Sequence, residues 1–174
     1  VCMVAGVAAF GGGTLRDVLL DIRPFFWVQH AHWLAALFAL CLLAMLLMRS
    51  RHQLAYTERA IVIPDAIGLG LFTALGTLTA LQLNMPALIA VLMGVFTSIC
   101  GGVLRDIVCN DIPQAFSDHR PYAIWAFLGG WLMLGLLTLG LSQELCLVSC
   151  AITTTSLRLV SWFFDWRLPE WRLQ

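Results

Sequence analysis

The chain has 174 residues, of which 60% are hydrophobic and only 11% are charged, and its formal net charge at pH 7 is zero. Soluble domains carry about 25% charged residues, so this chain has too little charge to cover a water-facing surface, and we expect its surroundings to be a lipid bilayer. The even charge balance offers no basic surface for nucleic acid, and no partner of that class is expected.

Apolar segments dominate the chain from end to end. Residues 1–20 supply a short apolar run followed by glycines, which is typical of the latter part of a membrane span whose beginning is absent. A helix needs about 20 apolar residues to cross the hydrocarbon core. Five later segments meet that length, namely residues 26–48, 66–83, 85–104, 121–141 and 145–164. The pattern predicts an all-α membrane protein.

The distribution of arginine predicts the orientation of these spans. Basic residues concentrate in cytoplasmic loops, and residues 49–65 hold the largest group of arginines, whereas the turns at 84–86 and 142–144 contain neither Lys nor Arg. We therefore expect 49–65 to be a cytoplasmic linker and the tail at 165–174 to be cytoplasmic. Residues 16–24 are the exception, because they contain two arginines and would lie outside.

One short motif occurs twice. Residues 11–17 read GGGTLRD and residues 100–106 read CGGVLRD, 89 positions later. Chance similarity between two apolar segments would match leucines, whereas this offset matches rarer residues. The matched pairs are Gly12 with Gly101, Gly13 with Gly102, Arg16 with Arg105, Asp17 with Asp106, Asp21 with Asn110, and Pro24 with Pro113. The sequence therefore predicts an internal repeat.

The repeat predicts an inverted architecture. Residues 66–141 contain three spans with the motif at the end of the middle one, and residues 1–48 contain the equivalents of the last two. The first repeat thus lacks its first helix, and residues 145–164 form a seventh helix after both repeats. Three is an odd number of spans, so the second repeat enters the membrane from the opposite side, as in many transport proteins.

The glycine pairs suggest two alternative structures. Adjacent glycines weaken a helix, and a broken helix at membrane depth must face protein or a water-filled cavity, so two opposed breaks would line a midplane route for a solute. Alternatively, the glycines allow close helix packing and each Arg–Asp pair lies at the membrane surface. The residues predicted to line the route are Gly11, Gly12, Gly13, Arg16, Asp17, Thr97, Ser98, Gly101, Gly102, Arg105, Asp106 and Arg158.

Three of these positions have a local alternative. Thr97 and Ser98 lie one turn before the second glycine pair, where they would line the route or bond to carbonyls of their own helix. Arg158 lies about six residues before the inner end of the last span, where it would extend to the membrane surface or reach toward the glycine breaks.

No residue pattern typical of an enzyme is present. The chain contains no nucleophile elbow, no HExxH and no phosphate-binding loop, and its six cysteines form no CxxC pair. We therefore expect no catalytic residues, no metal site and no cofactor.

The segments GGGTLRDVLLD, GGVLRDIVCNDIP and LRLVSWFFDWRLP resemble the bacterial members of the trimeric intracellular cation (TRIC) channel family, the same sequence family as the bacterial glycine transporters. The resemblance implies a seven-helix protomer of two inverted three-helix repeats plus a seventh helix, and a homotrimer with a pore in each protomer. It also implies that the second helix of each repeat is broken at its glycine motif. Cys100 stands where the first motif has Gly11, and the lysine of the animal channels is absent from both motifs.

Together these features predict an α-helical channel of the bacterial inner membrane that conducts monovalent cations, potassium first among them, and contacts membrane lipids. The alternative is a glycine carrier that uses the same two breaks. In that case Arg16 or Arg105 would bind the carboxylate, and Asp17 or Asp106 the ammonium group. A third possibility is a purely structural membrane protein with tight glycine packing.

Overall fold

The computed structural model describes residues 2–47, 57–117 and 120–167, and these residues form eight α-helices and no strand. Six are long enough to be main elements of the bundle, and α2 and α6 are single turns. The helices are α1 (Cys2–Leu19), α2 (Phe26–Gln29), α3 (Ala31–Leu47), α4 (Thr57–Gln82), α5 (Ala87–Val108), α6 (Gln114–Ser117), α7 (Ala123–Thr138) and α8 (Gln143–Phe163).

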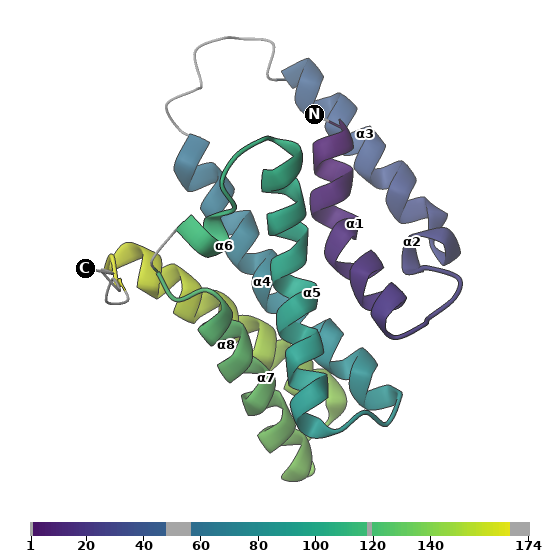
Figure 1. Cartoon of the computed structure of the whole chain (residues 1–174), viewed down its shortest axis with the longest axis vertical. Helices are drawn as coiled ribbons and strands as arrows, with labels where there is room; N and C mark the ends of the chain where they lie inside the picture. Colours follow the sequence, from purple (N-terminus) through teal and green to yellow (C-terminus); the bar gives the residue numbers. More distant parts are fainter. Residues whose placement is uncertain (1, 48–56, 118–119, 168–174) are drawn as a thin grey trace, which may run out of the picture.

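The helices pack side by side around α4 and α5 (Figure 1). α5 contacts α4, α1 and α7, and α8 packs against both α4 and α7. α3 lies at the edge of the bundle beside α1 (Figure 1). The chain is therefore an all-helical bundle, as its sequence predicts.

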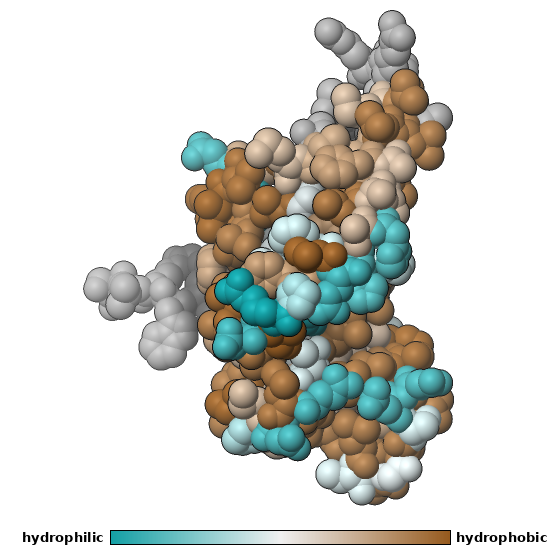
Figure 2. Space-filling view, turned by 90° about the vertical axis from the view of Figure 1, so that its right-hand side faces the viewer, coloured by the Kyte–Doolittle hydropathy of each residue, from teal (hydrophilic) through white to brown (hydrophobic). Residues whose placement is uncertain are grey.

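Within the described part of the chain, four helices are long and apolar enough to cross a bilayer: Cys2–Leu19, Val62–Gln82 within α4, Ala87–Val108 and Gln143–Phe163. α3 and α7 are apolar but shorter. Figure 2 shows a surface that is mostly hydrophobic, with the hydrophilic residues gathered into limited patches. Large apolar side chains face outward along these helices, which is the pattern of a protein whose surroundings are lipid.

The predicted linker at 49–65 differs from the structure in its second half. α4 begins at Thr57 and continues through Pro64, so residues 57–65 belong to the same helix as the predicted span at 66–83. A helix end is set by backbone hydrogen bonds and not by the limit of the apolar segment. The rest of that linker, residues 49–56, and the tail from 168 onward lie outside the described residues.

Five helices end in the same capping structure. In each, one residue has a positive φ between 48° and 81°, and the next backbone N–H bonds back to the carbonyl five residues earlier. This is the Schellman motif, which is open to Gly, Asn and Asp because other side chains are strained there. The residues with positive φ are Asp21, Asn84, Asn110, Gly140 and Asp165.

Candidate functional site: the paired GG-x-LRD motifs

The helix breaks predicted at the glycine pairs are absent. α1 is helical through Gly11, Gly12 and Gly13, and α5 is helical through Gly101 and Gly102. A glycine costs a helix about 1 kcal/mol relative to alanine, whereas an unpaired backbone group in hydrocarbon costs several kcal/mol. Unbroken hydrogen bonding therefore has the lower free energy, and no backbone carbonyl within these motifs is freed to bind a solute.

The first glycine of each aligned pair instead lets α1 and α5 approach closely. A Cβ atom on Gly12 would overlap the carbonyl oxygen of Thr97, and a Cβ on Gly101 would lie 2.8 Å from the carbonyl oxygen of Ala8. Both glycines are buried. The close-packing alternative is thus confirmed for these two positions, because any side chain there would force the two helices apart.

These two contacts are related by the repeat offset. Adding 89 to Ala8 and Gly12 gives Thr97 and Gly101, so the contact of Gly12 with Thr97 corresponds to that of Gly101 with Ala8. The pairing also runs in opposite directions along the two helices, which lie antiparallel in Figure 1. An inverted repeat with a pseudo-twofold axis at this crossing would produce this exchange of contacts.

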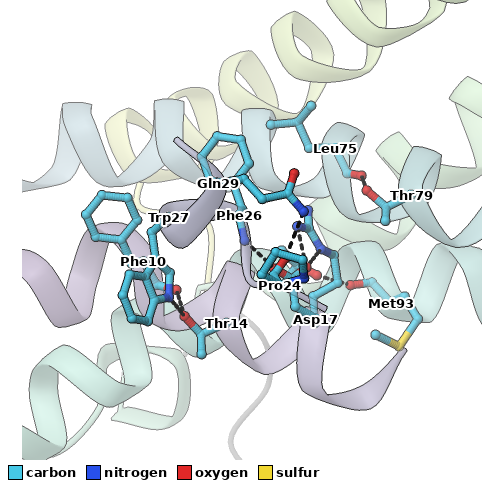
Figure 3. Close-up of polar contacts among 12 residues, drawn as sticks. Phe10, Thr14, Asp17, Pro24, Phe26, Trp27, Gln29, Leu75, Thr79 and Met93 are labelled. Atoms are coloured by element: carbon cyan, nitrogen blue, oxygen red, sulfur yellow. Dashed lines mark hydrogen bonds and ion pairs between the residues drawn. The ribbon is translucent and has the colours of Figure 1, made fainter. Parts of the chain in front are cut away.

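The Arg–Asp pair of the first motif binds the start of the next helix. Arg16 donates to Asp17 Oδ1 from Nη2 at 2.6 Å and from Nε at 2.9 Å. The Phe26 backbone N–H donates to Asp17 Oδ2 at 3.1 Å. Figure 3 shows the Asp17 carboxylate close to the backbone of Phe26, and the Trp27 indole bonded to Thr14. Asp17 is only 1% exposed, so it is an internal connector between α1 and α2.

The second motif repeats this arrangement. Arg105 Nε donates to Asp106 Oδ1 at 2.8 Å, and the Gln114 backbone N–H donates to Asp106 Oδ2 at 2.9 Å. Asp106 thereby connects α5 to α6 as Asp17 connects α1 to α2. Each carboxylate is therefore buried within the protein and has two partners.

The second motif also carries a polar cluster formed with residues outside the motif. Arg105 Nη1 lies 3.3 Å from Asp65 Oδ1, and Tyr122 Oη donates to Asp65 Oδ2 at 3.0 Å. The Arg158 guanidinium lies over the Tyr122 ring, 4.6 Å from its centroid, at a distance typical of a cation–π contact. Arg158 is 2% exposed, so it packs inside the bundle beside Tyr122.

Two cavities flank the α1–α5 crossing. One, of about 740 Å³, lies between α1, α4 and α5, and its lining includes Asp65, Arg105, Asp106, Asp111 and Gln114. The other, a groove of about 650 Å³ between α1, α3 and the second half of α4, is mostly apolar. The first is also largely apolar, but we call it the polar cavity because of its charged residues, and we call the second the apolar groove.

The predicted route residues divide into three groups. Ser98, Gly101, Gly102, Arg105 and Asp106 line the polar cavity, and Gly13 and Arg16 line the apolar groove. The remaining residues border neither of these cavities: Gly11, Gly12, Asp17, Thr97 and Arg158. The Thr97 hydroxyl bonds to the Met93 carbonyl of its own helix, and Ser98 bonds to Val95 while still facing the cavity.

Sequence reasoning missed Asp65, Tyr122 and Gln114 as site residues. The polarity of residues 49–65 places Asp65 in a linker, although its position directly before an apolar span is a usable signal, because a carboxylate at the end of a span needs a partner. Tyr122 and Gln114 carry no comparable signal in the sequence. Tyr122 acts through its contact with the distant Asp65, and Gln114 acts through its backbone N–H, which every residue except proline has.

Comparison with known proteins identifies the family. A family model described as glycine transporter matches residues 1–49 and 62–138. The chain belongs to this family. It is 35% identical to a UPF0126 membrane protein of Vibrio cholerae over 99% of this chain and 71% of that protein. The chain is thus a member of a bacterial membrane protein family.

Solved structures of TRIC channels share the fold. The TRIC channel orthologue from Rhodobacter sphaeroides is 31% identical, with a TM-score of 0.81 over 91% of this chain and 80% of that chain. A structure from work on conductance through TRIC cation channels is 26% identical, with a TM-score of 0.83 over 97% of this chain and 82% of that chain. The family resemblance predicted from the repeated motif is therefore confirmed.

Proposed function

We propose that the protein is a channel of the bacterial inner membrane that conducts monovalent cations, potassium first among them, through a route within each subunit of a homotrimer. The observation that carries this proposal is the lining of the polar cavity, where three carboxylates (Asp65, Asp106, Asp111) face one guanidinium (Arg105). A cavity with an excess of negative charge and low-dielectric walls concentrates cations and excludes anions. The similarity to solved TRIC cation channels supports the same class of solute.

The route we propose joins the two cavities. Ala9 of α1 and Phe72 of α4 are the two residues that border both the polar cavity and the apolar groove. An apolar constriction between these two residues would control conduction by excluding water. Arg16 and Gln82 supply polar groups in the groove beyond this point.

Side chains, and not backbone carbonyls, would interact with the ion along this route. The carbonyls of α1 and α5 are used within unbroken helices, whereas carboxylate and hydroxyl groups of Asp65, Asp106 and Ser98 face the polar cavity. Rings of carboxylates are a known way to select cations over anions.

Electrical recording from the purified protein in planar bilayers tests the proposal. We expect unitary currents with a reversal potential near that of K⁺ in asymmetric KCl, unaffected by glycine. Asp111→Asn should move the reversal potential toward that of Cl⁻ because it removes one carboxylate from the cavity. Glu144→Gln is the matched control, since Glu144 is exposed at the start of α8. The absence of cation-selective current in the wild-type protein would refute the channel.

A glycine carrier is the second candidate function, because the matching family model is described as glycine transporter. In the polar cavity the guanidinium of Arg105 lies beside the carboxylate of Asp65, so both charges of a zwitterion could be matched. Saturable uptake of labelled glycine into proteoliposomes, without unitary currents, would favour the carrier over the channel.

A further inference from the structure

Two cysteines face each other between α1 and α3. The side chain of Cys2, in the first turn of α1, lies within hydrogen-bonding range of the Cys41 thiol in the second half of α3. Both residues are free thiols. Figure 1 shows the start of α1 beside the later turns of α3. Two different helices therefore place their sulfur atoms close together.

A second contact supports this alignment of the two helices. A Cβ atom on Gly6 of α1 would lie 3.9 Å from Cδ2 of Leu37 of α3. The helices run in opposite directions (Figure 1), so one turn toward the start of α1 corresponds to one turn toward the end of α3. Residues four apart lie on the same face of a helix, which brings position 2 opposite position 41. The thiol contact thus follows from the packing of the two helices.

The surroundings of the pair suit thiols that are normally reduced. Cys41 is only 6% exposed, whereas Cys2 is half-buried. Cys41 lies six residues before the end of α3, and the distribution of arginine predicts that this end of α3 is cytoplasmic. Cytoplasmic thiols are kept reduced, so a bond between the two sulfur atoms would form only in the presence of an oxidant.

We propose that Cys2 and Cys41 form an oxidation site, at which hydrogen peroxide joins α1 to α3 by a reversible disulfide bond. The half-buried Cys2 reacts first, because a small oxidant reaches it more easily than the buried Cys41. Cys41 is the resolving thiol, since it lies next to the oxidised sulfur and not in solvent. A redox-sensitive cysteine is often placed beside such a partner.

The chemistry balances with one molecule of peroxide. The Cys2 thiolate attacks one peroxide oxygen, the O–O bond breaks, and the hydroxide that leaves takes up the Cys2 thiol proton to become water. The Cys41 thiolate then attacks the sulfenic sulfur, the S–O bond breaks, and the second hydroxide takes up the Cys41 thiol proton. The two thiols together lose two electrons and two protons, and the peroxide is reduced to two waters.

The bond would fix a weakly attached helix. α3 packs against α1 and α2 at the edge of the bundle (Figure 1), and the apolar groove lies between α3 and α4. A disulfide between positions 2 and 41 would restrict movement of α3 relative to α1, and both helices line this groove. The inference does not rest on the proposed function, because it holds for a channel and for a carrier alike.

Mass spectrometry tests the bond itself. The full-length protein in lipid nanodiscs is treated with hydrogen peroxide, the remaining thiols are blocked with N-ethylmaleimide, and linked peptides are identified. We expect a pair joining Cys2 to Cys41, which dithiothreitol separates again. The exposed Cys109 is the internal control for reaction with peroxide. Oxidation of Cys109 without the linked pair would overturn the proposal, and so would a pair that forms only with copper phenanthroline, because the site would then not respond to peroxide.

Thermal unfolding in detergent measures the effect of the bond on the fold. Peroxide should raise the unfolding temperature of the wild type by about 5 °C, because the bond restricts the unfolded chain, and dithiothreitol should reverse the rise. Cys2→Ala and Cys41→Ala should show no rise. Cys100→Ala is the matched control, since Cys100 is also half-buried in a helix and its loss leaves the pair intact. An equal rise in the wild type and in both variants of the pair would overturn the proposal.

Discussion

At the scale of single residues, the aspartate that ends each motif explains why an Arg–Asp pair followed by a short helix recurs 89 positions apart. Asp17 and Asp106 each accept from the preceding arginine with one oxygen and from the first turn of a short helix with the other. A carboxylate is needed because both partners are donors, and a buried carboxylate without donors would be costly. The motif is therefore a connector between two helices.

Asp106→Asn tests this connector. The amide keeps one acceptor but loses the charge that pairs with Arg105, so we expect the free energy of unfolding to fall by about 2 kcal/mol, as for a lost hydrogen bond to a charged group. Thermal unfolding in detergent measures the change, and Glu144→Gln at an exposed position should leave it unaltered. An unaltered midpoint in Asp106→Asn would mean that the connector contributes nothing to stability.

Asp165 predicts a pH dependence outside the membrane-spanning helices. Hydrogen bonds from Arg120, and then from Arg167, hold the pKa of this carboxyl below its usual value. A carboxyl whose folded-state pKa is depressed stabilises the fold above its unfolded-state pKa, and this stability is lost as pH falls through the folded-state pKa. The unfolding temperature of the wild type should therefore fall more on acidification below pH 4 than that of Asp165→Asn. The difference should be small, because exposed ion pairs contribute little, and curves of equal slope would contradict it.

At the scale of helices, the close approaches depend on size matching between glycine and threonine. A Cβ atom on Gly129 of α7 would overlap the hydroxyl of Thr154 of α8, and a Cβ on Gly94 of α5 would overlap the hydroxyl of Thr77 of α4. Small residues allow backbones to approach in membrane bundles, where no hydrophobic effect drives helices together. Each glycine thus makes room for a particular threonine.

Enlarging the glycine of one such pair should therefore disturb the packing of the two helices, and shortening the facing threonine should restore it. Gly129→Ala alone should destabilise the protein by about 1 to 3 kcal/mol through overpacking. Adding Thr154→Ala removes the hydroxyl that the new methyl group would meet, so the double variant should be more stable than the sum of the single changes predicts. Additive effects of the two substitutions on the unfolding temperature would show that the contact between positions 129 and 154 does not couple them, and would contradict the prediction.

The difference between local residue chemistry and contact with another helix explains which helical features could be predicted from the sequence. The spans, the repeat and the matched turns after Asp17 and Asp106 follow from residue chemistry that is local, because Asp21 and Asn110 both tolerate positive φ. The breaks were predicted wrongly because a glycine serves equally for backbone freedom or for close packing, and only the opposite helix decides between them. The ion pair of Asp65 with Arg105 joins residues 40 positions apart, which no local pattern reveals.

At the scale of the whole molecule, the two repeats carry similar connectors but different surroundings. The second motif lies beside Asp65, Tyr122 and Arg158 and opens into the polar cavity, whereas Arg16 of the first motif borders the apolar groove. Two similar motif helices thus border two unlike cavities, and the proposed route would be asymmetric. Residues from α4 and α8 supply the difference, and α8 belongs to neither repeat.

The proposed inversion of the two repeats makes a prediction about sidedness. Arg23 and Ile112 are equivalent under the 89-residue offset, and both are exposed just after the motif helices α1 and α5. If the repeats are inverted, the two positions lie on opposite sides of the membrane, with Ile112 on the cytoplasmic side according to the distribution of arginine. We expect a membrane-impermeant maleimide to label Arg23→Cys from the outside of intact spheroplasts, and Ile112→Cys only in inside-out vesicles. Both variants are made in a Cys109→Ser background, because Cys109 is also exposed close to Ile112. Labelling of both cysteines from the same side would rule out the inversion, and it would also conflict with the antiparallel crossing of α1 and α5 at Gly12 and Gly101.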